Sequence, residues 1–194
     1  MTSEVHIYMC RGSCSFASHI LLREAGVPFT HDWINVKLGF PRDKLHLNPK
    51  GAVPIIILDG ETITETPAIL TAISQFVPSK QLLGRTNLEI VRSYEWMNWI
   101  SGKLHGQAFA ALFRPAWFVD SPDAHEIVQR KATAKIRECF EMIEGKLDGR
   151  KWGNGRGFEM DQNFPNYARL ARGVAKRDSV VKAAEVEGID VLVD

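Results

Sequence analysis

The feature that most limits how this chain can fold is a short turn between two strand-forming stretches. Residues 54–58 read PIIIL and residues 61–64 read ETIT, and only Asp59 and Gly60 separate them. A two-residue Asp-Gly connection between β-forming segments is typical of a β-hairpin. We therefore expect these two strands to be antiparallel neighbours in whatever sheet the chain forms.

The residues around this hairpin alternate between strand and helix patterns. Residues 5–9 predict a short buried strand, residues 15–25 a helix, residues 29–36 a second strand, and residues 67–76 another helix. A loop with a short helix precedes the hairpin. Alternation of strands and helices favours parallel pairing, whereas the hairpin requires antiparallel pairing. The combination predicts a thioredoxin-like domain, with a mixed four-stranded sheet and helices.

Every long segment after residue 86 has a helical pattern. Residues 79–86 are predicted to link a thioredoxin-like domain of residues 1–78 to an all-helical domain of residues 87–194. The fold class is therefore a two-domain α+β/α architecture. The expected helices cover residues 87–113, 120–147, 165–175 and a last segment that Ser179 caps and Gly188 ends. In the second of these, an apolar face is made by Ile136, Phe140, Ile143 and Leu147.

Composition excludes several classes of function. The net charge of +1 gives no basic excess for binding nucleic acid. The first residues lack a secretory signal pattern, and no stretch has the length of a membrane span. Three cysteines cannot complete a disulfide framework, and none of them form a C-x-x-C pair. We expect a cytoplasmic protein without a metal site or membrane contact.

Cys14 is the first candidate for chemistry. It follows the first predicted strand and lies at the start of the first predicted helix, where backbone N–H groups and the helix dipole favour an anion. A thiol at such a position is expected to have a lowered pKa. A free cysteine is also commonly a small buried apolar residue. Position alone leaves both interpretations open.

Two further segments predict a site for an extended peptide ligand. A cis bond before Pro54 would expose the backbone of Val53 for pairing, although a proline can simply begin a strand. Thr66 as N-cap and Pro67 as first helical residue would leave backbone N–H groups free for a ligand carboxylate. The Glu65 carboxylate could then bind an ammonium beside it. Simple capping explains Thr66 and Pro67 but leaves Glu65 unexplained.

Asn98 and His105 are seven residues apart in a predicted helix. Seven residues are close to two α-helical turns, so the two side chains are expected on one face, about 10 Å apart along the axis. Both would then line one groove. For either residue taken alone, an ordinary polar helix face is the preferred interpretation.

Taken together, these segments resemble the glutathione S-transferase family, and most closely its bacterial beta class. The resemblance covers nearly the whole chain. It is carried by the cysteine-bearing run of residues 12–15 with residues 19–26, by residues 48–54 (NPKGAVP), by residues 64–69, by residues 95–100 with Leu104 and His105, and by residues 164–167 and 177–180.

The resemblance implies a glutathione transferase that joins the glutathione thiolate to a small apolar electrophile, with thiol–disulfide exchange as a further activity. Glutathione would be a co-substrate, with no other cofactor. Catalysis would involve Cys14 and His105. Glutathione would be bound by Lys37 at its glycine carboxylate, by Val53 beside cis-Pro54, by Glu65 and Thr66 at its γ-glutamyl end, and by Asn98 near the thiol. The family further implies a cytoplasmic homodimer active in detoxification.

Four aromatic residues are candidates for the apolar pocket of the second substrate, and equally for the core or a dimer interface. These are Phe109, Phe113, Trp117 and Phe118. The sequence does not name the electrophile.

The chain departs from the family pattern in two places. Thr66 stands where a smaller serine or glycine is usual. After Trp152, the helix that relatives open with a capping box is missing, since no serine or threonine lies between Ala134 and Asp178. Its loss predicts a poorly stable C-terminal half. It also leaves open an alternative function, a non-catalytic glutathione-binding module.

Overall fold

The computed structural model describes residues 4–147 and 163–191. The chain forms two compact units, one made of Met1–Tyr94 with Asp178–Asp194 and the other of Glu95–Arg177. No helix in the described part of the chain is long and apolar enough to cross a membrane.

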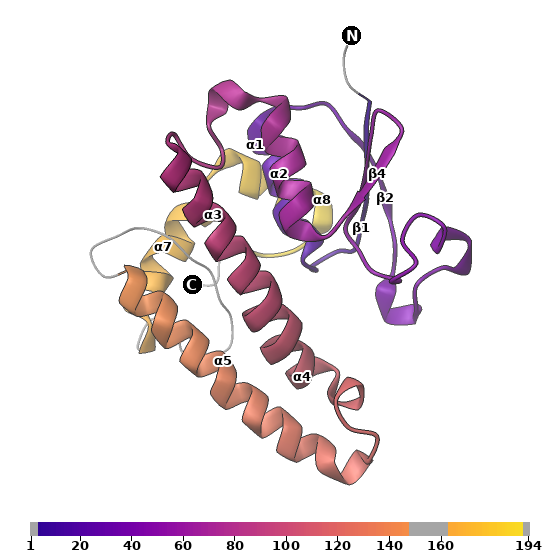
Figure 1. Ribbon diagram of the computed structural model, residues 1–194, viewed down its shortest axis with the longest axis vertical. Helices are drawn as coiled ribbons and strands as arrows, with labels where there is room; N and C mark the ends of the chain where they lie inside the picture. The colour runs from indigo at the N-terminus through magenta and orange to yellow at the C-terminus, as the bar shows by residue number, and fades with distance from the viewer. Residues whose placement is uncertain (1–3, 148–162, 192–194) are drawn as a thin grey trace. The chain divides into compact units, whose positions relative to one another are not determined.

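The first unit is built on the mixed sheet that the sequence predicts. Its strands are β1 (Val5–Met9), β2 (Thr30–Trp33), β3 (Ile55–Leu58) and β4 (Glu61–Thr64), in the order β2-β1-β3-β4 (Figure 1). β1 pairs with β2 in parallel and with β3 antiparallel, and β3 pairs with β4 antiparallel. The second strand is shorter than expected, because the chain turns into a 3₁₀ helix at Val36–Leu38.

The hairpin turn takes the conformation that its residues favour. Asp59 and Gly60 have φ angles of 49° and 88°, and two consecutive positive φ angles are typical of a type I′ turn. The turn is also tied to the start of β1, because the backbone N–H of Glu4 donates to Asp59 Oδ1 at 2.9 Å. The hairpin therefore sets the register of β3 and β4 and fixes one end of the sheet.

The two faces of the sheet bury different sets of residues. Side chains alternate along β1, so that Val5, Ile7 and Met9 lie in one apolar cluster and Tyr8 in another. The first cluster includes residues of α1 (Ser15–Ala25) and α2 (Thr66–Phe76), which match the predicted helices closely. The second lies against the irregular segment between β2 and β3. This segment is therefore held against the sheet by its own apolar residues.

The last helix belongs by contact to the first unit. α8 (Asp178–Glu187) packs on α1, although it is separated from it by the whole second unit in sequence. Ser179 lies inside this helix and donates to Glu24 Oε2 at 2.7 Å, so the expectation that it caps the helix is wrong. The proposed domain limits, with a linker at 79–86, remain predictions drawn from composition.

The second unit is helical. α3 (Asn87–Trp99) enters it and continues as a π-helix, η4 (Ile100–Phe109), and then as α4 (Ala110–Phe113). α5 (His125–Leu147) lies beside η4 and α4, and α7 (Pro165–Ala175) packs on α5 (Figure 1). The predicted apolar face of α5 is confirmed, because its four residues are all buried: Ile136, Phe140, Ile143 and Leu147.

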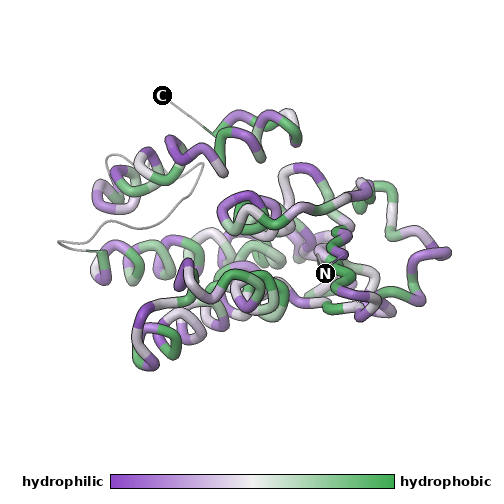
Figure 2. The backbone as a smooth tube through the Cα atoms, turned by 90° about the horizontal axis from the view of Figure 1, so that it is seen from above, coloured by the Kyte–Doolittle hydropathy of each residue, from purple (hydrophilic) through white to green (hydrophobic). Residues whose placement is uncertain are grey.

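Hydrophobic and hydrophilic residues alternate along the helices, as Figure 2 shows by colour. The apolar residues of the second unit form a core that includes Leu104 and Ala108 from η4, Phe140 from α5, and Tyr167 from α7. The predicted loss of a helix after Trp152 concerns residues 148–162, which lie outside the described residues.

Candidate active site

Cys14 lies at the N-cap of α1, one residue before the helix begins at Ser15. Two serines order the loop that leads to it. Ser15 Oγ donates to the carbonyl of Cys10 at 3.0 Å and accepts from the backbone N–H of Cys10 at 3.1 Å. Ser13 Oγ accepts from the backbone N–H of Ser15 at 3.2 Å. The cysteine is therefore presented on a short loop whose polar groups are already paired.

The thiol of Cys14 reaches the segment that precedes β3. Cys14 Sγ donates to the carbonyl oxygen of Val53 at 3.3 Å. The peptide bond between Val53 and Pro54 is cis, as the family resemblance implied. Three of the predicted site residues, separated by about 40 positions in sequence, are thus neighbours in the first unit. An extended chain laid along Val53 would bring its own side chain close to the sulfur of Cys14.

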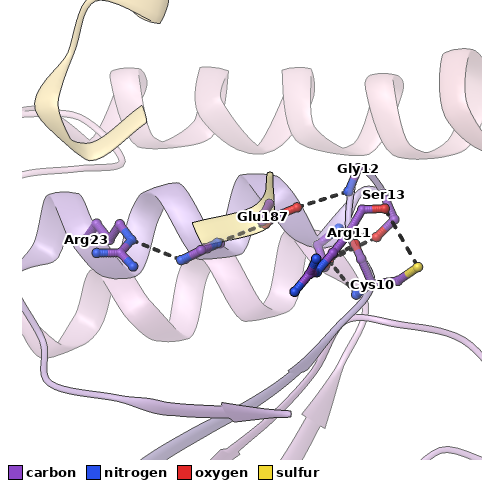
Figure 3. Close-up of polar contacts among 8 residues, drawn as sticks. Cys10, Arg11, Gly12, Ser13, Arg23 and Glu187 are labelled. Carbon is purple, nitrogen blue, oxygen red and sulfur yellow. Dashed lines mark hydrogen bonds and ion pairs between the residues drawn. The ribbon is translucent and has the colours of Figure 1, made fainter. Parts of the chain in front are cut away.

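A partly buried chain of polar contacts connects the cysteine loop to the end of α8 (Figure 3). Glu187 accepts from the backbone N–H of Gly12 at 3.0 Å through Oε2, and its Oε1 is 2.8 Å from His19 Nδ1. Arg23 Nε donates to His19 Nε2 at 2.9 Å. Because Nε2 accepts a hydrogen bond from Arg23, the imidazole is neutral and carries its hydrogen on Nδ1, which donates to Glu187.

The burial of its central members makes the hydrogen bonds of this polar chain energetically important. His19 and Glu187 are both fully buried, and Gly12 has a φ of +65°, which few residues other than glycine adopt. A buried carboxylate without partners would be costly, and here it has two donors. Sequence reasoning missed this arrangement because Glu187 and His19 are 168 residues apart, and no local pattern connects them.

Asn48 orders the loop that leads to Val53. It is 2% exposed, its Nδ2 donates to the carbonyl of Ala52 at 2.8 Å, and its Oδ1 accepts from the backbone N–H of Lys50 at 3.2 Å. Gly51 turns the chain with a φ of +65°. A single buried amide therefore spans both ends of the turn and holds the backbone before the cis bond.

Glu65 and Thr66 lie where β4 ends and α2 begins. α2 starts at Thr66, with Glu65 in the N-cap position at a φ of +71°, so the expectation that Thr66 is the N-cap is wrong. Within the described residues no side chain caps this end of the helix. The Glu65 carboxylate instead accepts from Lys50 Nζ at 2.5 Å. No local pattern in the sequence indicated this ion pair, which links residues 15 positions apart.

Lys37 belongs to the 3₁₀ helix Val36–Leu38, and its side chain lies outside what the structure describes. Its predicted contact with a glycine carboxylate remains a prediction.

Asn98 and His105 lie in the second unit, on α3 and η4 respectively, and both are exposed. The expected alignment of their side chains assumed an α-helical repeat. From Ile100 the backbone is π-helical, with hydrogen bonds between residues five apart and correspondingly wider turns. Seven residues therefore fall short of two full turns, so the α-helical premise of the predicted alignment does not hold from Ile100 onward. The shared groove of Asn98 and His105 stays a prediction.

The surroundings of His105 lower its pKa below the ordinary histidine value of 6.5. The main cause is desolvation by neighbouring atoms, and the charge of Arg114 adds to it. Both effects disfavour the imidazolium. His105 is therefore predominantly neutral at pH 7, and a neutral imidazole can accept a proton or a hydrogen bond.

The four aromatic candidates lie between the end of η4 and the segment that follows α4. Phe109 packs against the core, and its ring stacks on that of Phe113 at 5.9 Å. Phe113, Trp117 and Phe118 are 72%, 70% and 50% exposed, so the core interpretation is wrong for these three. Their place in an apolar pocket or a dimer interface stays a prediction.

In the described ranges no group of His, Cys, Asp and Glu side chains is placed to hold a metal ion.

Comparison with known proteins agrees with this arrangement. The family model for the glutathione S-transferase N-terminal domain matches residues 12–75. Two solved structures align with 95% of this chain and all of theirs, at 28% identity and a TM-score of 0.80. They are a sphingomonad glutathione S-transferase complexed with glutathione and the beta-class enzyme of Sphingomonas chungbukensis.

A curated relative supplies the decisive similarity. Glutathione S-transferase GstA of Escherichia coli O157:H7 is 36% identical over 152 residues, which cover 76% of this chain and 72% of the relative. The predicted two-domain architecture, a thioredoxin-like unit with a helical one, is confirmed by the sheet order, the helices and the aligned structures. The chain belongs to the glutathione S-transferase family of enzymes.

Proposed function

We propose that the protein binds glutathione, transfers its thiolate to small apolar electrophiles, and also exchanges disulfides through Cys14. The observation that carries the proposal is the 3.3 Å contact between Cys14 Sγ and the carbonyl of Val53. Val53 is the residue whose backbone would pair with the cysteinyl unit of glutathione. The contact therefore brings the protein thiol to the place where the glutathione sulfur would lie.

In conjugation, the glutathione thiolate attacks an electrophilic carbon. A carbon–sulfur bond forms, the bond to the leaving group breaks, and the leaving group departs with the electron pair. Holding the two reactants together supplies much of the rate gain, and groups that stabilise the thiolate supply more. The ordered loops at residues 10–15 and 48–54 are suited to this positioning.

In disulfide exchange, the Cys14 thiolate attacks the glutathione sulfur of a mixed disulfide. A disulfide forms between Cys14 and glutathione, and the other thiolate leaves. A second glutathione thiolate then attacks this disulfide, which releases oxidised glutathione and restores the Cys14 thiolate. Each step exchanges one sulfur–sulfur bond for another, so no outside oxidant is needed.

The remaining roles follow from the family resemblance. Glu65 and Thr66 are proposed to bind the γ-glutamyl end of glutathione. Lys37 is proposed to bind its glycine carboxylate, and Asn98 to bind glutathione near the thiol. His105 is proposed as a catalytic residue, which its neutral form supports because a neutral imidazole can accept a proton. We also propose a cytoplasmic homodimer active in detoxification, with Phe113, Trp117 and Phe118 available for an apolar substrate or a second copy of the chain.

Replacing Cys14 by serine tests the proposal. Serine keeps the size and hydrogen-bonding ability but is a poor thiol-exchange nucleophile. We expect C14S to lose nearly all turnover of the mixed disulfide formed from hydroxyethyl disulfide and glutathione, and to keep part of the conjugation of chlorodinitrobenzene. Cys139→Ala, which removes a thiol from the core of the second unit, is the matched control. Disulfide turnover by C14S at the wild-type rate would contradict the assigned role.

A further inference from the structure

The ion pair between Lys50 and Glu65 is not explained by stability. Lys50 Nζ is 2.5 Å from Glu65 Oε1 and 2.9 Å from Thr64 Oγ1. The two charged side chains are 53% and 63% exposed. Ion pairs with this exposure contribute little to stability, because water and salt screen them and two long side chains must be ordered. What the pair does provide is an accessible positive and negative charge side by side.

The backbone that carries Lys50 is held in place. Its N–H donates to Asn48 Oδ1, and Asn48 is itself buried and bonded to the carbonyl of Ala52. Gly51 then turns the chain. The ammonium group therefore extends from a fixed base to the end of β4.

The backbone that carries Glu65 is equally constrained. Its φ of +71° is uncommon for a residue with a side chain, and a residue stays in that region only when its surroundings determine it. It directly precedes α2, and its carbonyl accepts from the N–H of Ile69 at 3.0 Å. The positive end of the α2 dipole lies beside the same carboxylate.

Lys50 and Glu65 have more hydrogen-bonding groups than their mutual contact uses. A lysine ammonium has three donors, of which two are directed at Thr64 and Glu65. The Glu65 carboxylate has a second oxygen beyond the one bound to Lys50. Among the described residues, no partner takes the third ammonium hydrogen or the second carboxylate oxygen, and both side chains are more than half exposed. The charges complementary to them are a carboxylate and an ammonium on one small group.

We propose that Lys50 is a second specificity residue of the γ-glutamyl subsite, binding the α-carboxylate of the ligand while Glu65 binds its α-ammonium. The pair recognises both charges of the zwitterionic amino-acid end together. Each charge of the ligand contacts its opposite, and the Lys50–Glu65 contact is kept. This inference rests on the proposed function, because it needs glutathione at this subsite.

A calorimetric titration separates the contribution of Lys50 from general electrostatics. The ligands are glutathione and an analogue that lacks only the glutamyl α-carboxylate, 4-aminobutanoyl-cysteinyl-glycine. For Lys50→Met we expect the Kd of glutathione to rise about fivefold, as for one partly exposed charged hydrogen bond. The Kd of the analogue should change by less than about twofold, because the group that Lys50 binds is already missing. Lys50→Arg should keep most of the affinity for glutathione.

Lys135→Met is the matched control. It removes the same charge from an exposed ion pair, with Glu138 on α5 in the other unit. We expect wild-type affinity for both ligands.

Three outcomes overturn the inference. If K50M binds glutathione as tightly as the wild type, Lys50 takes no part in binding. If K50M binds it more tightly, Lys50 competes with the ligand for Glu65. If the affinities for glutathione and for the analogue fall equally, the effect is a general one of charge. Absence of glutathione binding by the wild type is a different result, because it would overturn the proposed function itself.

Discussion

His105 is a residue whose charge state is set by its surroundings. Its pKa is lowered by desolvation first and by Arg114 second. A histidine with this environment binds its proton less readily in the folded chain than in the unfolded chain. Folding then becomes less favourable as the pH falls below 6.5, where the unfolded chain begins to take up the proton that the folded chain does not.

This linkage predicts a pH dependence of stability. Between pH 7.5 and pH 5.5, the wild type should lose more free energy of unfolding than His105→Gln, because glutamine has no proton to bind. Urea unfolding at the two pH values measures the difference. His46→Gln, which removes an exposed histidine from the first unit, is the control for loss of a histidine as such. Equal losses in the wild type and H105Q would show that His105 has no lowered pKa.

At the scale of single elements, the start of α7 shows how one helix is held by another. The helix begins at Pro165, and two of its first N–H groups are satisfied by α5. Glu144 accepts from the backbone N–H of Asn166 through Oε1 and from that of Tyr167 through Oε2, each at 2.9 Å. A carboxylate at a helix N-terminus is favoured both by these hydrogen bonds and by the dipole.

Removing this cap should loosen α7. We expect Glu144→Ala to lower the free energy of unfolding by about 1–2 kcal/mol, the range for loss of an N-cap. Faster hydrogen exchange at the amides of Asn166 and Tyr167 should accompany the change. Glu141→Gln alters an exposed glutamate one turn earlier on the same helix and is the matched control. Unchanged protection of both amides in E144A would contradict the capping role.

The π-helix η4 is the element of the candidate site that departs most from the α-helical geometry expected from the sequence. It carries His105 and contributes Leu104 and Ala108 to the core of the second unit. A π-helical stretch is rare and is frequently found at functional sites. Leu104 and Ala108 are buried in this core, whereas His105 beside Leu104 is exposed.

At the scale of the whole molecule, the helix that the family pattern leads us to expect after Trp152 bears on stability. Its loss would expose apolar faces, at about 25 cal/mol per Å², so a few hundred Å² would cost several kcal/mol. Total stability is commonly about 5–15 kcal/mol. We therefore predict a thermal transition that is lower and broader than that of a relative such as GstA, measured side by side by calorimetry. A transition as high and as sharp would contradict this prediction.

Much of the first unit follows from local sequence. Asp59 and Gly60 encode a hairpin through their own backbone preferences, and the alternation in β1 assigns each side chain to one face of the sheet. Helix α1 could be located because its apolar pattern ends at Gly26, which takes a left-handed φ of +70°. These features depend on neighbours within a few residues, so a single sequence suffices to predict them.

Other features depend on residues that meet only after folding. Glu187 reaches Gly12 and His19 from the far end of the chain, and Lys50 reaches Glu65 across two segments of the first unit. Likewise, no pattern in the sequence predicts the π-helical geometry of Ile100–Phe109. Local residue preferences thus determined the strands, the hairpin and most helices. Only the tertiary structure decided which buried or exposed charges pair, because hydrogen bonds and ion pairs depend on distance in space and not on separation along the chain.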